Sequence, residues 1–432
     1  MIAAQSSSLN MDAKFKKTPI GEIPVEWEVS TIGQCAGVNL FTIPDNTPDN
    51  KKIRYIDISS IEKTGSISGI RDLFFRDAPS RARRKIEAGD ILVSTVRPYL
   101  RAFAMVHDNG GDLIASTGFA VLSSTGVNGE FLYQFVLSEP FAQFLTERMT
   151  GSNYPAVNSS DVALCPIPLP PTQEQMKIAD ILSSVDDAIQ KADAVIAKTR
   201  DLKKALMQRL LTRGLGHTKF KKSPIGEIPV EWEVSEIGNY LDVYSGFAFK
   251  SGQFITKTPS AIPLVKIGNL QSGQIKFGEN TDYVDSQKYS ELPEFRLNEG
   301  EILIALSGAT TGKIAVAQKG LGQALVNQRV GIFRIKVATK IFQNFLPHLL
   351  NTDNFRSSVL EGLDKGAQEN LSPSNIKKVM IPIPPLNEQT KIAEILSSVD
   401  DAIEKSESRR NRLDQTKKSL MADLLTGRVR TV

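Results

Sequence analysis

The chain contains two copies of one sequence frame. A stretch of 19 residues, FKKTPIGEIPVEWEVSTIG at 15–33, returns at 220–238 with 17 positions identical. A second stretch of 18 residues, EQMKIADILSSVDDAIQK at 174–191, returns at 388–405 with 15 positions identical. Self-similarity of this kind indicates a duplicated structural unit. Each copy consists of a leading segment, a variable body, a proline block and a long helix, so the chain can present two different surfaces on one repeated frame.

The two bodies, Gln34–Cys165 and Asn239–Met380, share a pattern but little sequence. Each contains short β-type runs between Gly, Asn and Ser turns, and each closes with a stretch of helical spacing. The β-type runs are Ile91–Val96 and Ile302–Ala305, and the helical stretches are Gly129–Arg148 and Lys340–Leu360. A chain of 432 residues with 41% hydrophobic content supports two such cores. We expect each body to be a compact domain of the α+β class.

A proline pair precedes each long helix. Pro170–Pro171 and Pro384–Pro385 hold the backbone extended and stop any preceding helix. Thr172 and Asn387 are the predicted N-caps, and a glutamate follows each of them in the first turn, where the helix dipole favours a carboxylate. The helices themselves are predicted from Gln173 and from Glu388, each about 57 Å long at 1.5 Å per residue.

Apolar residues recur at heptad spacing in both helices, most regularly in the first two heptads. Neither helix would be stable alone, so we expect them to pair as an antiparallel coiled coil, with one domain at each end and a pseudo-two-fold relation between the copies. The alternative is that each helix packs against its own body. The predicted pairing residues are Ile178, Ile181, Val185, Val195, Leu202, Leu206, Ile392, Ile395, Val399, Leu413 and Leu420.

These features predict five segments. They are a disordered tail at 1–14, a first domain at 15–171, a first spacer helix at 172–214, a second domain at 215–386 and a second spacer helix at 387–432. The tail lacks the basic and apolar regions of a signal peptide, and no 18-residue apolar run occurs. Cys35 and Cys165 are isolated, which fits a reducing compartment. We expect a soluble cytoplasmic protein without membrane contact.

The sequence shows no convincing catalytic motif. The three histidines are scattered, and no methylation motif or glycine-rich dinucleotide fingerprint is found. GATTGK at 308–313 has three residues between its glycines where a phosphate loop needs four, and Ile314 replaces the Ser or Thr that would hold magnesium. We therefore expect a turn between strands there. The paired carboxylates Asp186–Asp187 and Asp400–Asp401 are expected on the solvent side of the helices, in salt bridges or facing a partner. The chain is predicted not to be an enzyme and to hold no metal.

Basic residues gather in the first body. Residues 71–101 hold eight Lys and Arg against four Asp and Glu, in a chain of formal net charge +4. Such a patch would supply phosphate contacts, and nearby aromatic and amide groups could read base edges. The candidate DNA contacts are Arg81, Arg83, Arg84, Lys85, Arg97, Tyr99, Arg101, Asn153 and Tyr154. The alternative for each is a solvated charged face.

The second body has basic and amide residues near glycine-rich turns. Asn and Gln can pair bidentately with adenine, and Arg or Lys with guanine. The candidate DNA contacts here are Lys250, Lys266, Asn269, Gln271, Thr310, Thr311, Lys313, Asn327, Gln328, Arg329, Gln368 and Asn370. Turn-forming amides are again the alternative.

Several motifs resemble those of the specificity subunit of type I restriction-modification systems. They are PIPLPPTQEQMKIADIL at 166–182, PIPPLNEQTKIAEIL at 382–396, YSGFAFKSGQF at 244–254, VKIGNLQSGQI at 265–275, GEILIALSGATTGKIAV at 300–316 and ALVNQRVGIF at 324–333. The resemblance runs from Phe15 to Arg428. In the first body, GDILVSTVRPYL at 89–100 and IASTGFAVL at 114–122 keep the strands but lack the GATTGK-type turn.

The resemblance implies that each body is a target recognition domain for one half of a bipartite, asymmetric sequence in double-stranded DNA. It implies that the helices space the domains and dock two modification (methyltransferase) subunits. Those subunits would bring S-adenosylmethionine, and restriction (motor-nuclease) subunits would bring ATP and magnesium, so this chain would bind no cofactor itself. Two other readings are a non-catalytic coiled-coil scaffold joining two protein-binding domains and an autonomous DNA-modifying enzyme. A scaffold would bind no DNA sequence selectively, and an enzyme would need the missing motifs.

Overall fold

The computed structural model describes residues 14–62, 65–108, 110–361 and 370–431. The chain divides into two compact units, unit 1 with residues 1–195 and 406–432 and unit 2 with residues 196–405. Each unit therefore combines one body with a segment of each long helix. Of the predicted tail, residues 1–13 lie outside the described residues. No helix among the described residues is long and apolar enough to cross a membrane.

The leading segment forms the same strands in both copies. Gly21 and Gly226 directly follow the hairpin turns and have φ of 104° and 103°, a conformation that favours glycine. The hairpins are β1 (Phe15–Thr18) with β2 (Gly21–Pro24) and β13 (Phe220–Ser223) with β14 (Gly226–Pro229). The next strand of each copy pairs antiparallel with the proline block. These pairs are β3 (Glu28–Thr31) with β12 (Pro166–Leu169) and β15 (Glu233–Glu236) with β25 (Met380–Ile383).

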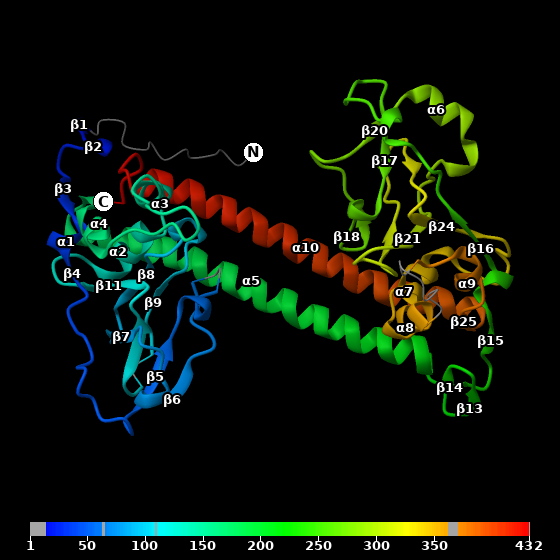
Figure 1. Ribbon diagram of the computed structural model, residues 1–432, viewed down its shortest axis with the longest axis horizontal. Helices are drawn as coiled ribbons and strands as arrows, with labels where there is room; N and C mark the ends of the chain where they lie inside the picture. Colours follow the sequence, from blue (N-terminus) through cyan, green and yellow to red (C-terminus); the bar gives the residue numbers. More distant parts are fainter. Residues whose placement is uncertain (1–13, 63–64, 109, 362–369, 432) are drawn as a thin grey trace, which may run out of the picture. The chain divides into compact units, whose positions relative to one another are not determined.

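The first body contains two four-stranded sheets (Figure 1). The first sheet has the order β6 (Arg71–Phe74), β5 (Lys52–Ile56), β10 (Leu113–Ser116), β7 (Ala82–Lys85). The second has the order β4 (Ala36–Val38), β11 (Phe119–Ser124), β8 (Ile91–Ser94), β9 (Phe103–Met105). Its α-helices are α1 (Ile32–Cys35), α2 (Gly129–Val136), α3 (Glu139–Thr146) and α4 (Ser159–Leu164).

The second body has a six-stranded and a three-stranded sheet. The larger has the order β16 (Leu241–Ser245), β24 (Val330–Ile335), β21 (Ile302–Ala305), β22 (Ile314–Val316), β19 (Gln274–Ile275), β18 (Leu270–Gln271). The smaller has the order β20 (Tyr283–Val284), β17 (Ile262–Val265), β23 (Leu325–Val326). The α-helices are α6 (Ser286–Glu291), α7 (Leu346–Leu350), α8 (Asp353–Glu361) and α9 (Pro373–Lys377).

The prediction of two bodies that mix helices and strands is confirmed. The strand order β4-β11-β8-β9 of unit 1 matches β16-β24-β21-β22 of unit 2. The parallel pair β5–β10 of the first body has a counterpart in β17–β23 of the second, where β19 and β22 are also parallel. The helical stretch predicted at Gly129–Arg148 is two helices, because Ser138 caps α3 and its hydroxyl accepts from the Phe141 amide. The stretch predicted at Lys340–Leu360 is likewise split, between α7 and α8.

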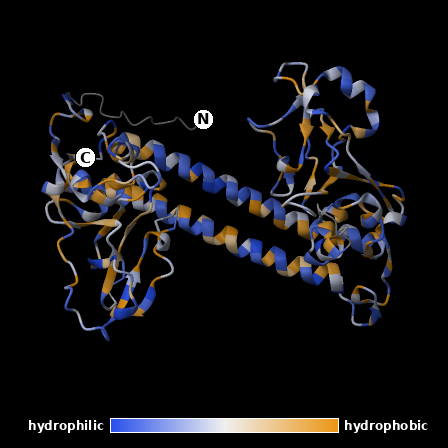
Figure 2. Ribbon diagram, in the orientation of Figure 1, coloured by the Kyte–Doolittle hydropathy of each residue, from blue (hydrophilic) through white to orange (hydrophobic). Residues whose placement is uncertain are grey.

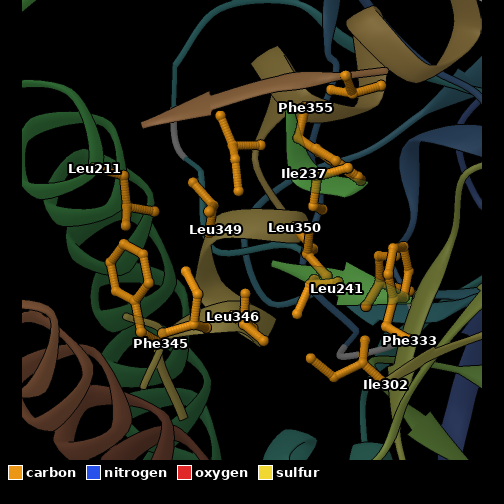
Figure 3. Packing of buried hydrophobic residues seen from close by; sticks show 14 of the residues in the cluster. Leu211, Ile237, Leu241, Ile302, Phe333, Phe345, Leu346, Leu349, Leu350 and Phe355 are labelled. Carbon is orange, nitrogen blue, oxygen red and sulfur yellow. The ribbon is translucent and has the colours of Figure 1, made fainter. Parts of the chain in front are cut away.

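In the largest hydrophobic cluster of each unit, a tryptophan of the leading segment packs with helix ends from distant parts of the sequence. In unit 1, Trp27 is buried with Ile178 of the first long helix and Leu424 of the second. In unit 2, Trp232 shares a cluster with residues of both helices as well. Figure 3 shows Leu211 in that cluster beside Phe345. The long helices are therefore integral to both cores.

The long helices are α5 (Thr172–Arg213) and α10 (Leu386–Leu424). The carbonyl oxygens of Pro171 and Pro385 accept from the amides of Gln175 and Gln389, at 3.0 Å in both cases. These prolines therefore stand at the N-cap, and the predicted caps Thr172 and Asn387 are wrong because both residues lie inside the first turn. A proline suits this place because it has no N–H to donate, and the N–H groups at the start of a helix have no acceptor within the helix.

Within each unit the two helix segments run antiparallel. In unit 1, Lys417 contacts Asp186 at 2.6 Å and Arg410 contacts Asp193 at 3.2 Å. In unit 2, Lys203 contacts Asp400 at 2.5 Å. Of the paired carboxylates, Asp186 and Asp400 thus face the other helix and form salt bridges, whereas Asp187 and Asp401 are exposed. Hydrophilic residues cover much of α10 (Figure 2), so charge pairs replace apolar contacts along part of its length.

The predicted heptad seam is only partly correct. Ile178 and Ile392 are buried, but Ile181 is 37% exposed and Leu202 52% exposed, so both are wrong as pairing residues. Val195 is also 52% exposed and lines a cavity of about 260 Å³ together with Ser184, Ala188, Lys191, Ala192, Ser406 and Arg409. Burial on α5 instead includes Glu174, Ile178, Leu182, Ile189, Ile196 and Leu210. From Leu182 onward these residues keep the seven-residue spacing but lie one position after the predicted residues Ile181 and Val195 and their repeats, so the buried face is rotated by one residue from the predicted seam.

Candidate nucleic-acid interface

A cluster of three backbone segments forms at the ends of strands β21, β22 and β24, within the larger sheet of unit 2. The first is the turn between β21 and β22, and the second is the turn between β23 and β24. Their contact is a hydrogen bond from the Leu306 amide to the Arg329 carbonyl, at 2.9 Å. The third segment joins through the Leu371 amide, which donates to the Leu306 carbonyl at 2.8 Å. We call residues 307–313, 327–329 and 370–371 the unit 2 turn cluster.

The GATTGK sequence is the hairpin turn of this cluster. β21 and β22 pair antiparallel on either side of it, which confirms the predicted turn between strands. Gly308 and Gly312 have φ of 83° and 79°, and the Thr311 hydroxyl donates to the Gly308 carbonyl at 2.7 Å. The glycines thus serve a tight turn, whose exposed residues are Gly308 and Ala309.

The cluster brings together most of the residues predicted in this body. Gln328 and Arg329 are exposed, Asn370 forms a bridge with Ser307, and Lys313 is half-buried. Among the described residues, no ion pair joins Lys313 or Arg329 to a carboxylate. The cluster also contains Thr310, Thr311 and Asn327, whereas Gln368 lies outside the described residues.

Asn327 is 6% exposed, and its side-chain oxygen accepts from the Arg329 amide at 3.2 Å. It shapes the turn and is too buried to read a base, which corrects its predicted role.

Four further predicted residues lie on neighbouring turns and mostly support those turns. The ammonium group of Lys266 pairs with Asp282, and its amide donates to the Asn269 side chain at 2.9 Å. Asn269 also donates to the Lys276 carbonyl, and Gln271 to the Gly268 carbonyl. Lys250 is exposed at the start of the turn that Gln253 closes. These contacts occupy the polar groups of Lys266 and Asn269, so their predicted base contacts stay without support.

Unit 1 builds a turn cluster with the same backbone contacts. The Thr95 amide donates to the Gly118 carbonyl at 2.8 Å, as Leu306 does to Arg329 in unit 2. The Val157 amide donates to the Thr95 carbonyl at 2.9 Å, as Leu371 does to Leu306. We call residues 95–102, 117–118 and 150–156 the unit 1 turn cluster. The missing GATTGK-type turn is therefore replaced by another turn at the same place in the fold.

Arg97 joins two segments of the unit 1 turn cluster. Its guanidinium lies over the ring of Tyr154, 4.8 Å from the centroid, and donates to the Asn153 carbonyl at 3.3 Å. Tyr154 is 72% exposed and Tyr99 47% exposed. Arg101 pairs with Glu139, which balances its charge. The structure thus brings five of the predicted residues of the first body to one place.

The predicted basic patch on β7 is mostly neutralised by carboxylates. Arg81 contacts Asp57 at 2.5 Å and also donates to the Tyr55 hydroxyl; this hydrogen bond, with the Asp57 carboxylate, raises the pKa of Arg81. The ion-pair partners of Arg83 and Lys85 are Asp45 and Glu87, both at 3.5 Å.

Arg84 is half-buried, and burial lowers its pKa. Ion pairs thus occupy most of the patch in the fold, and its phosphate contacts stay a prediction.

Leu100 is an exposed residue of the unit 1 turn cluster that is not among the predicted contacts. It is 62% exposed at the tip of the turn in the unit 1 turn cluster. An alignment of GDILVS at 89–94 with GEILIA at 300–305 would have placed this turn opposite GATTGK. No cluster of His, Cys, Asp and Glu that could hold a metal occurs in the described part of the chain.

Two bodies of matched topology, each with a polar turn cluster and a long helix, define a duplicated recognition protein. The family model of the type I restriction modification DNA specificity domain matches residues 24–196 and 229–415. The chain belongs to this family and is a DNA specificity subunit, a recognition subunit without catalytic activity of its own.

Curated relatives match over nearly the full length. The chain is 30% identical to the type I restriction enzyme MjaVIII specificity subunit of Methanocaldococcus jannaschii, across 97% of this chain and 96% of that protein. It is also 30% identical to the putative MjaX specificity subunit of that organism, across 97% of each. A solved S subunit of a type I restriction-modification system from M. genitalium has a TM-score of 0.57 at 15% identity, covering 92% of this chain and 96% of that one. This last likeness concerns the fold.

Proposed function

We propose that the two units read the two halves of a bipartite, asymmetric DNA sequence for a type I restriction-modification complex. The observation that carries this proposal is the pair of turn clusters. They share backbone hydrogen bonds and strand order, yet their side chains differ. Equal scaffolds with unequal side chains are what two different half-sites require, because bases are distinguished by groups that contact their edges.

The side chains of each cluster suit contact with DNA. The unit 1 turn cluster offers aromatic and guanidinium groups at Tyr99, Tyr154 and Arg97, and the unit 2 turn cluster offers Thr311, Gln328 and Arg329. Arg and Gln make bidentate contacts with guanine and adenine, and hydroxyls contact either bases or phosphates. A lysine such as Lys313 adds a salt-dependent phosphate contact.

The long helices have a second role in this proposal. They form an antiparallel coiled coil that spaces the two recognition domains, with a pseudo-two-fold relation between the copies, and they dock two modification (methyltransferase) subunits. The repeated sequence and the antiparallel ion pairs of each unit support it. S-adenosylmethionine, ATP and magnesium enter through the modification and restriction subunits. Two DNA-binding domains related by such a two-fold axis bind one face of B-DNA when their centres are about 34 Å apart.

Exchange of one body tests the proposal. The chain is co-expressed with its modification subunits, and methylated adenines are mapped across the genomic DNA of the host. Replacing Gln34–Cys165 with the same body of a relative should change one half of the split motif and leave the other half unchanged. A control exchange of Asn239–Met380 should change only the other half. A motif that changes in both halves, or in neither, would contradict the assignment of one half-site to each unit.

A further inference from the structure

The turn of the unit 1 turn cluster carries an apolar tip. Tyr99 and Leu100 are adjacent in the chain and are 47% and 62% exposed. They belong to a short 3-10 turn, Pro98–Leu100, that stands between β8 and β9. Large exposed apolar groups are unremarkable singly, but two together amid polar segments mark a contact surface. The tip therefore has the character of a surface that a ligand covers.

The backbone of this tip is held in a strained conformation. Arg97 and Arg101, which flank it, have φ of 49° and 53°, in the left-handed region that non-glycine residues seldom adopt. Such strain persists where the surroundings determine it, and it concentrates at functional sites. Here the Arg97 amide donates to the Pro155 carbonyl at 2.8 Å, and its guanidinium stacks on Tyr154. The tip is thus preorganised before any ligand binds.

The corresponding turn of unit 2 has a different chemistry. It consists of Gly308, Ala309, Thr310, Thr311 and Gly312, of which the exposed Gly308 and Ala309 allow a close approach to the backbone and Thr311 carries a half-buried hydroxyl. Unit 1 offers an aliphatic side chain that can make no hydrogen bond and an aromatic ring with one hydroxyl. The two turns occupy the same place in the strand order. The two half-sites must therefore be recognised by different kinds of contact at this position.

We propose that Leu100, supported by Tyr99, determines specificity in the first half-site by packing against the methyl group of a thymine in the major groove. The C5-methyl group of thymine is the apolar group that base pairs present in this groove. An aliphatic tip cannot discriminate bases by hydrogen bonding, so the methyl group is the feature it can select. This inference rests on the proposed function, that unit 1 reads one half of a split DNA site.

Deoxyuridine substitution tests the inference, because deoxyuridine keeps every hydrogen-bonding group of thymine and lacks only the methyl. The full chain is used in complex with its modification subunits, on duplexes that carry the mapped split site. Each thymine is replaced in turn and Kd is measured. At one thymine of the half-site assigned to unit 1, Kd should rise about fourfold, the effect of removing one buried methyl group. Leu100→Ala should bind thymine and deoxyuridine duplexes equally.

Leu164→Ala is the matched control, since Leu164 is 63% exposed on α4 and lies outside both turn clusters. It should keep the discrimination of the unmodified chain. The inference is overturned if the first half-site contains no thymine, if no deoxyuridine there weakens binding, or if Leu100→Ala still discriminates. Absence of sequence-specific binding by the unmodified complex is a separate result, which would overturn the proposed function and this inference with it.

Discussion

At the residue scale, a buried glutamate at the start of α5 organises unit 1. Glu174 is 1% exposed and accepts from the Trp27 indole at 3.0 Å and from the Arg430 guanidinium at 2.7 and 2.9 Å. Burial by itself would raise the pKa of Glu174, but the hydrogen bonds from Arg430, Trp27 and the Thr431 amide bring it below its usual value. One carboxylate thus ties together the leading segment, α5 and the chain after α10.

Unit 2 repeats this arrangement with a histidine in place of the arginine. Glu388 is 8% exposed and accepts from the Trp232 indole at 2.9 Å and from the Leu215 amide at 2.8 Å. The imidazole of His217, which follows α5, lies 2.9 Å from the same carboxylate. In both copies the tryptophan and the glutamate therefore make the same buried contact. Their third partner comes from the segment that follows the other long helix.

We expect Glu174→Gln to destabilise unit 1, because it leaves the largely buried Arg430 without its main counter-charge. Breaking a buried pair from one side typically costs about 3 kcal/mol. Equilibrium urea unfolding, followed by tryptophan fluorescence, measures this loss. Asp180→Asn is the control, since Asp180 is exposed on the same helix. Equal stability of the two variants would show that the buried pair contributes nothing.

His348 should make unit 2 less stable in mild acid. Burial lowers the pKa of His348 to about 4, and its side chain lies 3.2 Å from the Ser397 hydroxyl. In the unfolded chain the pKa of His348 has the ordinary histidine value of 6.5, so the unfolded state takes up a proton at a higher pH than the folded state. The stability of unit 2 is therefore unaffected by His348 above pH 6.5 and falls by up to about 3 kcal/mol as pH falls toward 4.

Gln134 of unit 1 donates to Asp186 much as His348 faces Asp400, so Gln is the natural replacement. His348→Gln should remove this part of the pH dependence in urea unfolding between pH 4 and 7. The same change at the exposed His107 serves as control. An unaltered pH profile in the variant would contradict the role of His348.

At the element scale, the long helices were far more predictable than the turns. Their proline stops and apolar spacing are local signals, and the structure differs from the predicted starts by one or two residues. The seam was less accurate, because burial depends on what each helix meets. The turn at Arg97–Arg101 contains no glycine, so the sequence does not indicate its two left-handed residues. The stacking of Arg97 on Tyr154 joins positions far apart in the sequence.

Gly246 allows the backbone segments of unit 2 to approach one another closely beside its turn cluster, because it has no side chain. A Cβ atom there would lie 2.3 Å from the Val326 carbonyl oxygen and 2.4 Å from that of Asn327. Gly246→Ala should therefore cost about 2 kcal/mol or more in the free energy of unfolding, and should weaken DNA binding through the second half-site. Urea unfolding and binding measurements check both.

Gly252→Ala is the matched control, because a Cβ atom at Gly252 would have no neighbour within 4 Å and the residue has no positive φ. It should change stability by less than about 0.5 kcal/mol. If the two alanine variants behave alike, backbone crowding at Gly246 is not what holds this turn.

At the scale of the whole molecule, each unit is assembled from stretches that are distant in sequence. Unit 1 takes its last residues from 406–432, and Leu424 and Leu425 share its core with Ile178. The boundaries between units fall inside α5 and α10, not at the predicted domain limits at 171 and 386. Each body therefore depends on both helices for its core.

The spacer role predicts a change in the recognised sequence. Inserting about one helical turn, four residues, after Val195 and after Lys405 lengthens both helices by about 6 Å. At 3.4 Å per base pair, the gap between half-sites should grow by about one to two base pairs. Adenine-methylation mapping measures the gap, and insertion in α5 alone is the control, expected to disturb helix pairing. An unchanged gap in the double insertion would exclude the spacer role.

The sequence alone determined that the chain is duplicated, that each copy mixes strands and helices before a long helix, and which family it resembles. These are local or repetitive properties, and a single chain displays them. Only the tertiary structure decided that Arg81 and Arg83 pair with Asp57 and Asp45, that Glu174 is held by Arg430, and that unlike turns occupy one place in the two bodies. Each depends on contacts between residues distant in the sequence, and side-chain periodicity carries no information about which distant residue makes the contact.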